Sequence, residues 1–200
     1  MIYPIVAYGT PVLRKKAVDI SPEDPELKAL IADMFETMYQ AHGVGLAAPQ
    51  INKSIRLFVV DCSPFAEDDE DDDEETNGQV DKSLADFKKV FINAQMLEET
   101  GEEWGFTEGC LSIPDIREEV KRKPTITIRY FDEHFVEHTD TFSGFAARVI
   151  QHEYDHIEGV LFTDKINPMK RSLLSGKLNE ISKGRVDVRY KMKFPQAKRR

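Results

Sequence analysis

The sequence predicts an α+β fold with mainly antiparallel strands, and three observations support this class. Segments with alternating or β-branched apolar residues occur at 55–61, 90–97, 126–130, 135–142 and 186–194. Apolar residues at helical spacing occur at 25–43, 144–159 and 168–183. No regular strand–helix–strand repeat connects these segments, which argues against a doubly wound parallel sheet. The length of 200 residues fits a single domain, here taken as 1–200.

Each predicted element has its own local signal. The first helix begins near Pro25, continues through an apolar stripe and ends at Gly43, a residue type common just beyond helix ends. Residues 43–50 hold two glycines and a proline among small apolar residues, which predicts a tight, buried loop. The segments 126–130 and 135–142 are predicted to form a hairpin. The C-terminal part, 168–195, is predicted as a helix followed by a strand.

The net charge of −9 comes entirely from one run of acids. Residues 67–75 are nine consecutive acids, and the remaining acids and bases number 27 each. A neutral body lacks the basic face of a generic nucleic-acid binder, so no specific DNA partner is expected. Such dense like charge without an apolar residue predicts a mobile surface loop within 63–83.

Cysteine content and hydropathy predict a cytoplasmic location. Cys62 and Cys110 are too few for a disulfide framework, and Cys62, at the end of a strand, is interpreted as a packing residue. The N-terminus shows no signal-peptide pattern, and no stretch reaches the roughly 18 apolar residues of a membrane span. We therefore expect no membrane partner.

The strongest local signal is His152-Glu153-Tyr154-Asp155-His156, an HExxH motif. On a helix, His152 and His156 lie one turn apart and on the same apolar stripe, close enough to bind one metal ion. Glu153 flanks that stripe and is placed to act as a base toward a water on the ion. The alternative is that both histidines are ordinary core residues.

Two histidines leave a metal ion short of ligands, since catalytic zinc takes three protein ligands. Cys110 is the best candidate for the third, because the preceding glycine lets the backbone approach an ion closely; the alternative is a small buried hydrophobe. His134 and His138 are also four residues apart, but in a strand they lie about 13 Å apart and cannot share an ion. We interpret them as surface hairpin residues.

Three motifs together resemble those of bacterial peptide deformylases, which remove the formyl group from nascent chains. They are Gly43-Val44-Gly45-Leu46-Ala47-Ala48-Pro49-Gln50, Glu108-Gly109-Cys110-Leu111-Ser112 and the HExxH motif, in the family's order. The likeness extends over about residues 4–170. It implies antiparallel sheets packed around a central helix that carries the HExxH motif.

The resemblance also implies a role for each site residue. Cys110, His152 and His156 correspond to the metal ligands, and Glu153 to the general acid and base. The side chain of Gln50 and the backbone N–H of Leu111 correspond to the groups that polarise the formyl oxygen. The substrate contacts correspond to Val44, Gly45 and Arg117. Apart from the resemblance, Val44, Phe145 and Val149 are candidates for the wall of a methionine pocket; the alternative is plain core packing.

The implied cofactor is one divalent ion, Fe²⁺ in the cell, with Zn²⁺, Ni²⁺ or Co²⁺ as substitutes. The implied partners are N-formyl-methionyl nascent peptides and the ribosome near its exit tunnel. The sequence departs from the family pattern in two places. The acidic run resembles an insertion. A predicted strand follows the C-terminal helix, which puts ribosome docking through that helix in question.

Other functions stay open at the level of sequence. One is a zinc peptidase or another metallohydrolase, and a second is a cysteine hydrolase with Cys110 as the nucleophile. A third is a non-enzymatic acidic interaction protein. Two measurements distinguish the three: the metal content of the purified protein, and its activity on formylated peptides compared with unblocked ones.

Overall fold

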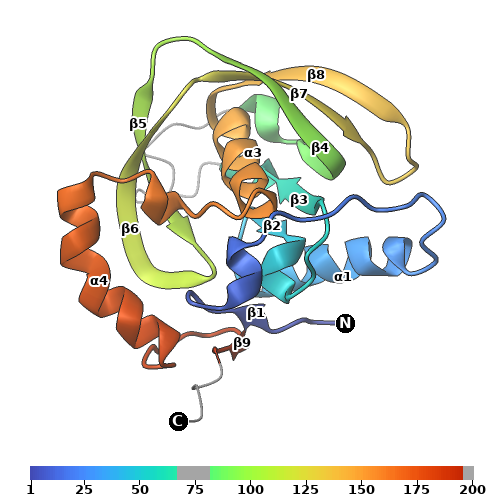
Figure 1. The fold of residues 1–200 in the computed structure, drawn as a ribbon. Helices are drawn as coiled ribbons and strands as arrows, with labels where there is room; N and C mark the ends of the chain where they lie inside the picture. Colours follow the sequence, from blue (N-terminus) through green and yellow to red (C-terminus); the bar gives the residue numbers. More distant parts are fainter. Residues whose placement is uncertain (67–81, 196–200) are drawn as a thin grey trace.

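The computed structural model describes residues 1–66 and 82–195 and confirms the α+β class (Figure 1). The main sheet is antiparallel, with the strand order β2, β3, β4, β7, β8. These strands are Gly45–Ala47, Leu57–Asp61, Lys88–Thr100, Thr125–Phe131 and Glu137–Ser143. A second antiparallel sheet pairs β5 (Trp104–Cys110) with β6 (Ile113–Arg122), and β1 (Ile5–Val6) pairs in parallel with β9 (Met192–Lys193).

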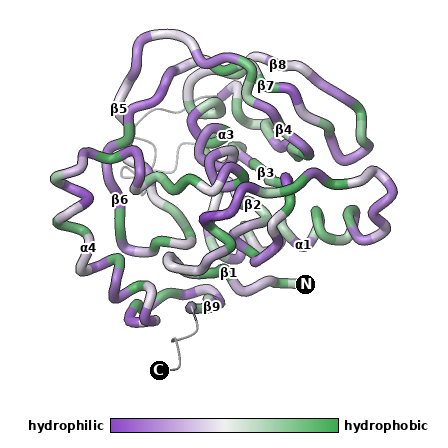
Figure 2. The backbone as a smooth tube through the Cα atoms, viewed as in Figure 1, coloured by the Kyte–Doolittle hydropathy of each residue, from purple (hydrophilic) through white to green (hydrophobic). Residues whose placement is uncertain are grey.

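Two helices cover opposite faces of the main sheet. The helix α1 (Leu27–Gln40) packs in one apolar cluster with Leu57 and Val59 of β3, whereas α3 (Gly144–Ile157) packs in another with Phe58 and Val60. Successive side chains of a strand point to opposite faces, so β3 is apolar over four consecutive residues (Figure 2). The predicted hairpin is confirmed as β7 and β8.

A third apolar cluster lies between the two-stranded sheet β5–β6 and the helix α4 (Pro168–Ser182), which runs beside β6 in Figure 1. It also takes in the 3₁₀ helices η1 (Pro11–Arg14) and η5 (Phe162–Asp164). Among the described residues, no helix has the length and apolar character needed to cross a membrane.

The prediction that Gly43 ends the first helix is wrong by one residue. Ala41 caps α1, and His42 follows in the left-handed conformation with φ +55°. The N–H of Gly43 then donates to the carbonyl of Met38 at 3.0 Å, and the N–H of His42 donates to that of Tyr39 at 3.0 Å. This is a Schellman ending with histidine in the position that glycine usually takes.

Three further expectations differ from the structure. Residues 43–50 form a short edge strand, β2, and a 3₁₀ helix, η2 (Ala48–Ile51), rather than a loop. The strand β6 was not predicted, and the predicted strand at 186–194 pairs only at Met192–Lys193. The acidic run 67–75 lies outside the described residues, between η3 (Ser63–Ala66) and η4 (Lys82–Leu84).

Candidate active site

Two elements that are far apart in the sequence place the candidate metal ligands together. The strand β5 ends with Cys110, and the helix α3 carries His152 and His156 on one side. One ligand atom from each of the three residues lies within 4.8 Å of the others. The Sγ atom of Cys110 is 3.4 Å from Nε2 of His156.

These three side chains fit a divalent metal ion. In a tetrahedral site with about 2.3 Å to sulfur and 2.0 Å to nitrogen, neighbouring ligand atoms lie about 3.5 Å apart. The Cys110–His156 distance agrees with that geometry; His156 is buried and Cys110 is partly buried. One thiolate and two imidazoles suit zinc, iron, cobalt or nickel rather than magnesium or calcium.

The buried carboxylate of Glu108 orients the first histidine. It is 5% exposed, and its Oε2 atom lies 3.0 Å from Nδ1 of His152, an arrangement that leaves Nε2 of the ring available to a metal ion. The same carboxylate accepts hydrogen bonds from Arg122 at 2.7 and 3.0 Å and from Arg148 at 3.0 Å. Arg122 also donates to Asp155 at 2.7 Å.

The charge of Glu108 is maintained by these partners. Burial by itself raises the pKa of a carboxyl group, but the hydrogen bonds from His152 and Arg122 outweigh burial and hold the pKa of Glu108 well below its usual range. Two buried guanidinium groups, of Arg122 and Arg148, thus face the carboxylates of Glu108 and Asp155, and Lys165 adds a further positive charge 3.3 Å from Asp155.

Glu153 stands beside the candidate ligands. Its side chain is buried, and its Oε2 atom has no hydrogen bond among the described residues. Burial raises the pKa of Glu153 to about 7. The carboxylate packs on Gly45, where an added Cβ atom would lie 2.7 Å from Cγ of Glu153.

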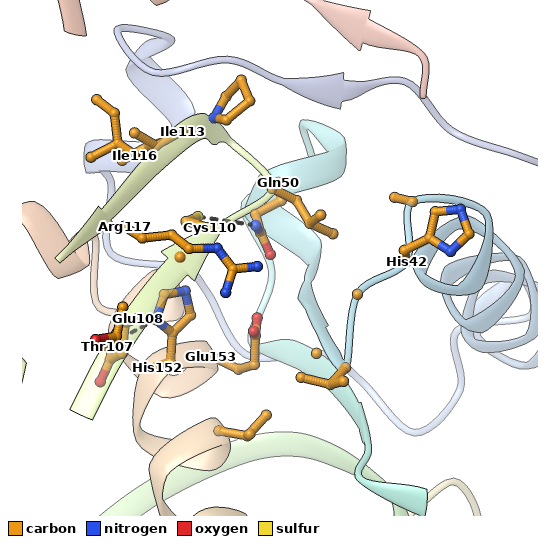
Figure 3. Close-up of a pocket in the computed structure, with 18 of the residues that line it drawn as sticks. His42, Gln50, Thr107, Glu108, Cys110, Ile113, Ile116, Arg117, His152 and Glu153 are labelled. Carbon is orange, nitrogen blue, oxygen red and sulfur yellow. Dashed lines mark hydrogen bonds and ion pairs between the residues drawn. The ribbon is translucent and has the colours of Figure 1, made fainter. Parts of the chain in front are cut away.

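Gln50 is fixed with its amide nitrogen toward the cysteine. Its Oε1 atom accepts from the N–H of Ala47 at 2.8 Å, which sets the direction of the amide group. Its Nε2 atom is 3.6 Å from Sγ of Cys110 and 3.4 Å from Oγ of Ser112. Figure 3 shows Gln50, Glu153 and His152 converging on the same space, with the guanidinium of Arg117 reaching toward it.

All of the predicted site residues except His156 line one cavity of about 650 Å³. His156 lies next to it, in contact with Cys110. Phe145 and Val149, the candidates for an apolar wall, line it as well. His134 and His138 do not; Nε2 of His138 is 2.8 Å from Asp132 on the surface hairpin. The buried Cys62 belongs to the core cluster around α3, and the structure gives it no place in the cavity.

Sequence reasoning missed three residues that shape this site. Glu108 lies two positions before Cys110 on the same strand. Side chains two positions apart on a strand point to the same face, so the sequence did offer a signal that Glu108 lies near Cys110. Arg122 and Tyr190 carried no local signal, because each reaches the site only through the folding of distant segments. Tyr190 donates a hydrogen bond to the carbonyl of Leu111 at 2.8 Å.

Comparisons with known proteins agree with this geometry. The family model "Polypeptide deformylase" matches residues 2–172. The peptide deformylase of Christiangramia forsetii is 59% identical over 199 residues, covering 100% of this chain and 99% of that protein. That of Flavobacterium johnsoniae is 57% identical over 199 residues, with the same coverage.

Solved structures give the same result. The peptide deformylase of Legionella pneumophila superposes with a TM-score of 0.75 at 35% identity, covering 92% of this chain and 96% of that one. The enzyme of Thermotoga maritima superposes with a TM-score of 0.70 at 38% identity, covering 84% and 99%. With its fold, its cavity and its sequence in agreement, the chain belongs to the polypeptide deformylase family.

Proposed function

We propose that this cavity removes the formyl group from N-formyl-methionyl peptides by hydrolysis, with Cys110, His152 and His156 holding one divalent ion. The observation that carries the proposal is the convergence of these three ligand atoms beside the buried carboxylate of Glu153, whose Oε2 atom has no hydrogen bond within residues 1–66 and 82–195. When bound, an ion of this kind polarises a carbonyl group and makes a coordinated water a stronger nucleophile.

The roles of the other residues follow from their positions. Glu153 takes a proton from the attacking water and passes it to the departing amine. A bond forms between the water oxygen and the formyl carbon, the carbon–nitrogen bond breaks, and formate and a free N-terminus result. Gln50 Nε2 and the N–H of Leu111 donate to the developing oxyanion; one such donor is worth about 3 kcal/mol.

The strand β2 provides a binding edge for the peptide. It lies at one end of the main sheet and, within the part of the chain that the structure describes, pairs only with β3, which leaves its other edge for an extended chain. Gly45, on this strand, is proposed to pair with the substrate backbone. Val44, Phe145 and Val149 would form the apolar wall for the methionine side chain, and Arg117 would contact the peptide at the mouth of the cavity.

The proposed ion in the cell is Fe²⁺, with Zn²⁺, Ni²⁺ or Co²⁺ able to replace it, because a mixed sulfur and nitrogen ligand set accepts all four. Elemental analysis of protein purified without oxygen, at one ion per chain, checks this. We further propose that the enzyme acts in the cytoplasm, on nascent chains near the ribosomal exit tunnel.

The test of the function is release of formate from formyl-Met-Ala-Ser, with unblocked Met-Ala-Ser as the matched substrate. We expect cleavage of the first and none of the second, and inhibition by a chelator. Hydrolysis of the unblocked peptide would instead indicate a peptidase. Activity that a chelator leaves intact would indicate a cysteine hydrolase.

The variant Glu153→Gln tests the role of the base. It preserves the shape that packs on Gly45, and we expect it to keep its metal and to lose at least about 100-fold in kcat. Metal content and turnover are measured on the same sample. Loss of the ion in parallel with activity would mean that Glu153 is a ligand or a structural residue.

A further inference from the structure

The segment after α4 returns to the cavity and forms part of its wall. It pairs with the N-terminal strand, as Ile5 N–H donates to the carbonyl of Lys191 at 2.8 Å and Ala7 N–H to that of Lys193 at 2.9 Å. Figure 1 shows β9 beside β1 at the lower edge of the molecule. Four residues just before this pairing line the cavity: Asp187, Val188, Arg189 and Tyr190.

Tyr190 makes a specific contact with the site. Its hydroxyl donates to the carbonyl oxygen of Leu111 at 2.8 Å, and its ring packs against the apolar cluster beneath α1. Burial, together with the nearby charges of Cys110 and Asp115, raises the pKa of Tyr190, so the hydroxyl stays protonated and remains a donor.

The carbonyl that Tyr190 holds belongs to a tight turn. Leu111 and Ser112 are the two residues between β5 and β6, and the flanking residues Cys110 and Ile113 are paired across the ladder. Ser112 is held as well: its carbonyl accepts from the N–H of Tyr8 at 2.8 Å, and its hydroxyl lies 3.4 Å from Nε2 of Gln50. Tyr190 is therefore the contact that fixes the Leu111 carbonyl.

The position of the Leu111 N–H depends on these anchors. The ladder fixes the peptide on the Cys110 side of Leu111, and the hydrogen bond from Tyr190 fixes the peptide on the Ser112 side. With both neighbouring peptide planes set, the backbone angles of Leu111 have little freedom. A preorganised donor does not have to reorganise while the reaction takes place, and this is the source of its catalytic value.

We propose that Tyr190 is a positioning residue: its hydroxyl holds the Leu111 turn so that the Leu111 N–H points at the oxyanion. This inference rests on the proposed function, in which that N–H is an oxyanion donor. It gives the C-terminal segment a part in the reaction, although Tyr190 lies 34 residues beyond His156, the last residue of the HExxH motif.

The experiment compares Tyr190→Phe with Tyr130→Phe. Each variant removes one hydroxyl whose hydrogen bond is 2.8 Å long, but the bond of Tyr130 goes to Asp140 in the main sheet, away from the cavity. For Tyr190→Phe we expect kcat to fall about tenfold, part of the 10²–10³ that loss of a whole donor costs, with KM, metal content and Tm as in the Tyr130 variant. For Tyr130→Phe we expect kcat as in the wild type.

A second readout does not depend on activity or on the ion. Amide hydrogen exchange at Leu111, followed by NMR, should be faster in Tyr190→Phe than in the wild type and unchanged in Tyr130→Phe. Unchanged kcat in Tyr190→Phe, or equal exchange at Leu111 in both variants, would overturn the proposal. A wild type that releases no formate would refute the proposed function instead, while the exchange experiment would still decide whether Tyr190 holds the turn.

Discussion

Glu108 shows how one side chain stabilises a site that contains several buried charges. Its carboxylate contacts His152, Arg122 and Arg148, and all of these side chains are largely buried. Removing charges from water costs several kcal/mol per ion, which only close opposite charges and full hydrogen bonding offset. The orientation of His152 is thus tied to the integrity of the whole cluster.

The variant Arg122→Met should be strongly destabilising, by about 3–5 kcal/mol, because it leaves the carboxylates of Glu108 and Asp155 buried without their main partner. Urea unfolding followed by circular dichroism measures the change. The control is Lys170→Met, which removes an exposed ion pair with Glu118 and should leave the free energy of unfolding unchanged. Equal effects of the two variants would contradict the importance of the buried cluster.

At the scale of elements, α3 and β2 approach each other closely at Gly45. An alanine there would bring its Cβ atom within 2.7 Å of Cγ of Glu153. We expect Gly45→Ala to lower stability by about 1–3 kcal/mol and to reduce activity by moving the carboxylate.

The matched control is Gly176→Ala on α4, where an added Cβ atom meets nothing within 4 Å. Alanine is the better helix former, so this variant should gain about 0.5–1 kcal/mol at full activity. Thermal unfolding and formate release are measured on both. A Gly45→Ala variant as stable and active as the wild type would show that Glu153 has room to shift.

The contact between α1 and β3 makes stability depend on pH. Burial alone would raise the pKa of Asp61, but hydrogen bonds from Ser63 and Tyr39 and the charge of Lys88 outweigh it and lower that pKa. A folded-state pKa below the unfolded value of about 3.9 adds stability at higher pH, and this stability is lost as the pH falls through the folded-state pKa.

Asp61→Asn should therefore lose less stability than the wild type between about pH 5 and pH 2. Urea midpoints across this range test it, and parallel curves for the two proteins would exclude Asp61 as a contributor.

Elements with long, regular patterns could be predicted from the sequence, and short ones could not. The stripe of Leu27, Leu30, Ile31, Met34 and Met38 gave α1 to within a few residues. The strand β6 has five charged residues among its last six and a proline near its start, so it shows no clean alternation. Apolar and polar residues do alternate at 186–194. The apolar ones pack on the third apolar cluster or line the cavity, and most of the segment does not pair as a strand.

The residues of the candidate site divide in the same way, into those with a local sequence pattern and those without one. The HExxH spacing is local, so His152 and His156 could be predicted to share a helix face, with Glu153 beside it. Their convergence with Cys110 was inferred through the motif, and the structure places these side chains together. Arg122 and Tyr190 join them through contacts set by packing across the whole chain, which no local pattern encodes.

At the scale of the whole molecule, the candidate ligands link two separate parts of the fold. Cys110 comes from the two-stranded sheet, and the histidines come from the helix that packs on the main sheet. An ion bound there stabilises the native state by mass action, by about 4 kcal/mol at a thousand times its Kd. Removal of the ion should lower Tm, and adding it back should restore Tm.

Cys110→Ser tests that linkage. The weaker ligand should reduce metal affinity, so the difference in Tm between the chelated and the metal-loaded protein should shrink relative to the wild type. Differential scanning calorimetry with and without a chelator gives both values. If the variant kept full occupancy, full activity and the same difference, Cys110 would be a packing residue.

The parallel pairing of β1 with β9 has a consequence for the way the enzyme is made. Ile5 pairs with Met192, so the first strand of the chain finds its partner only after almost everything between them has been synthesised. Domains assemble from the N-terminal side as they emerge, and contacts between residues so distant in sequence form slowly because their loop must close first. The main sheet, by contrast, is complete once β8 has been made. A growing chain would thus bring its candidate metal ligands together before it holds Tyr190 against the Leu111 turn. Full activity would then arrive as a distinct last step of folding.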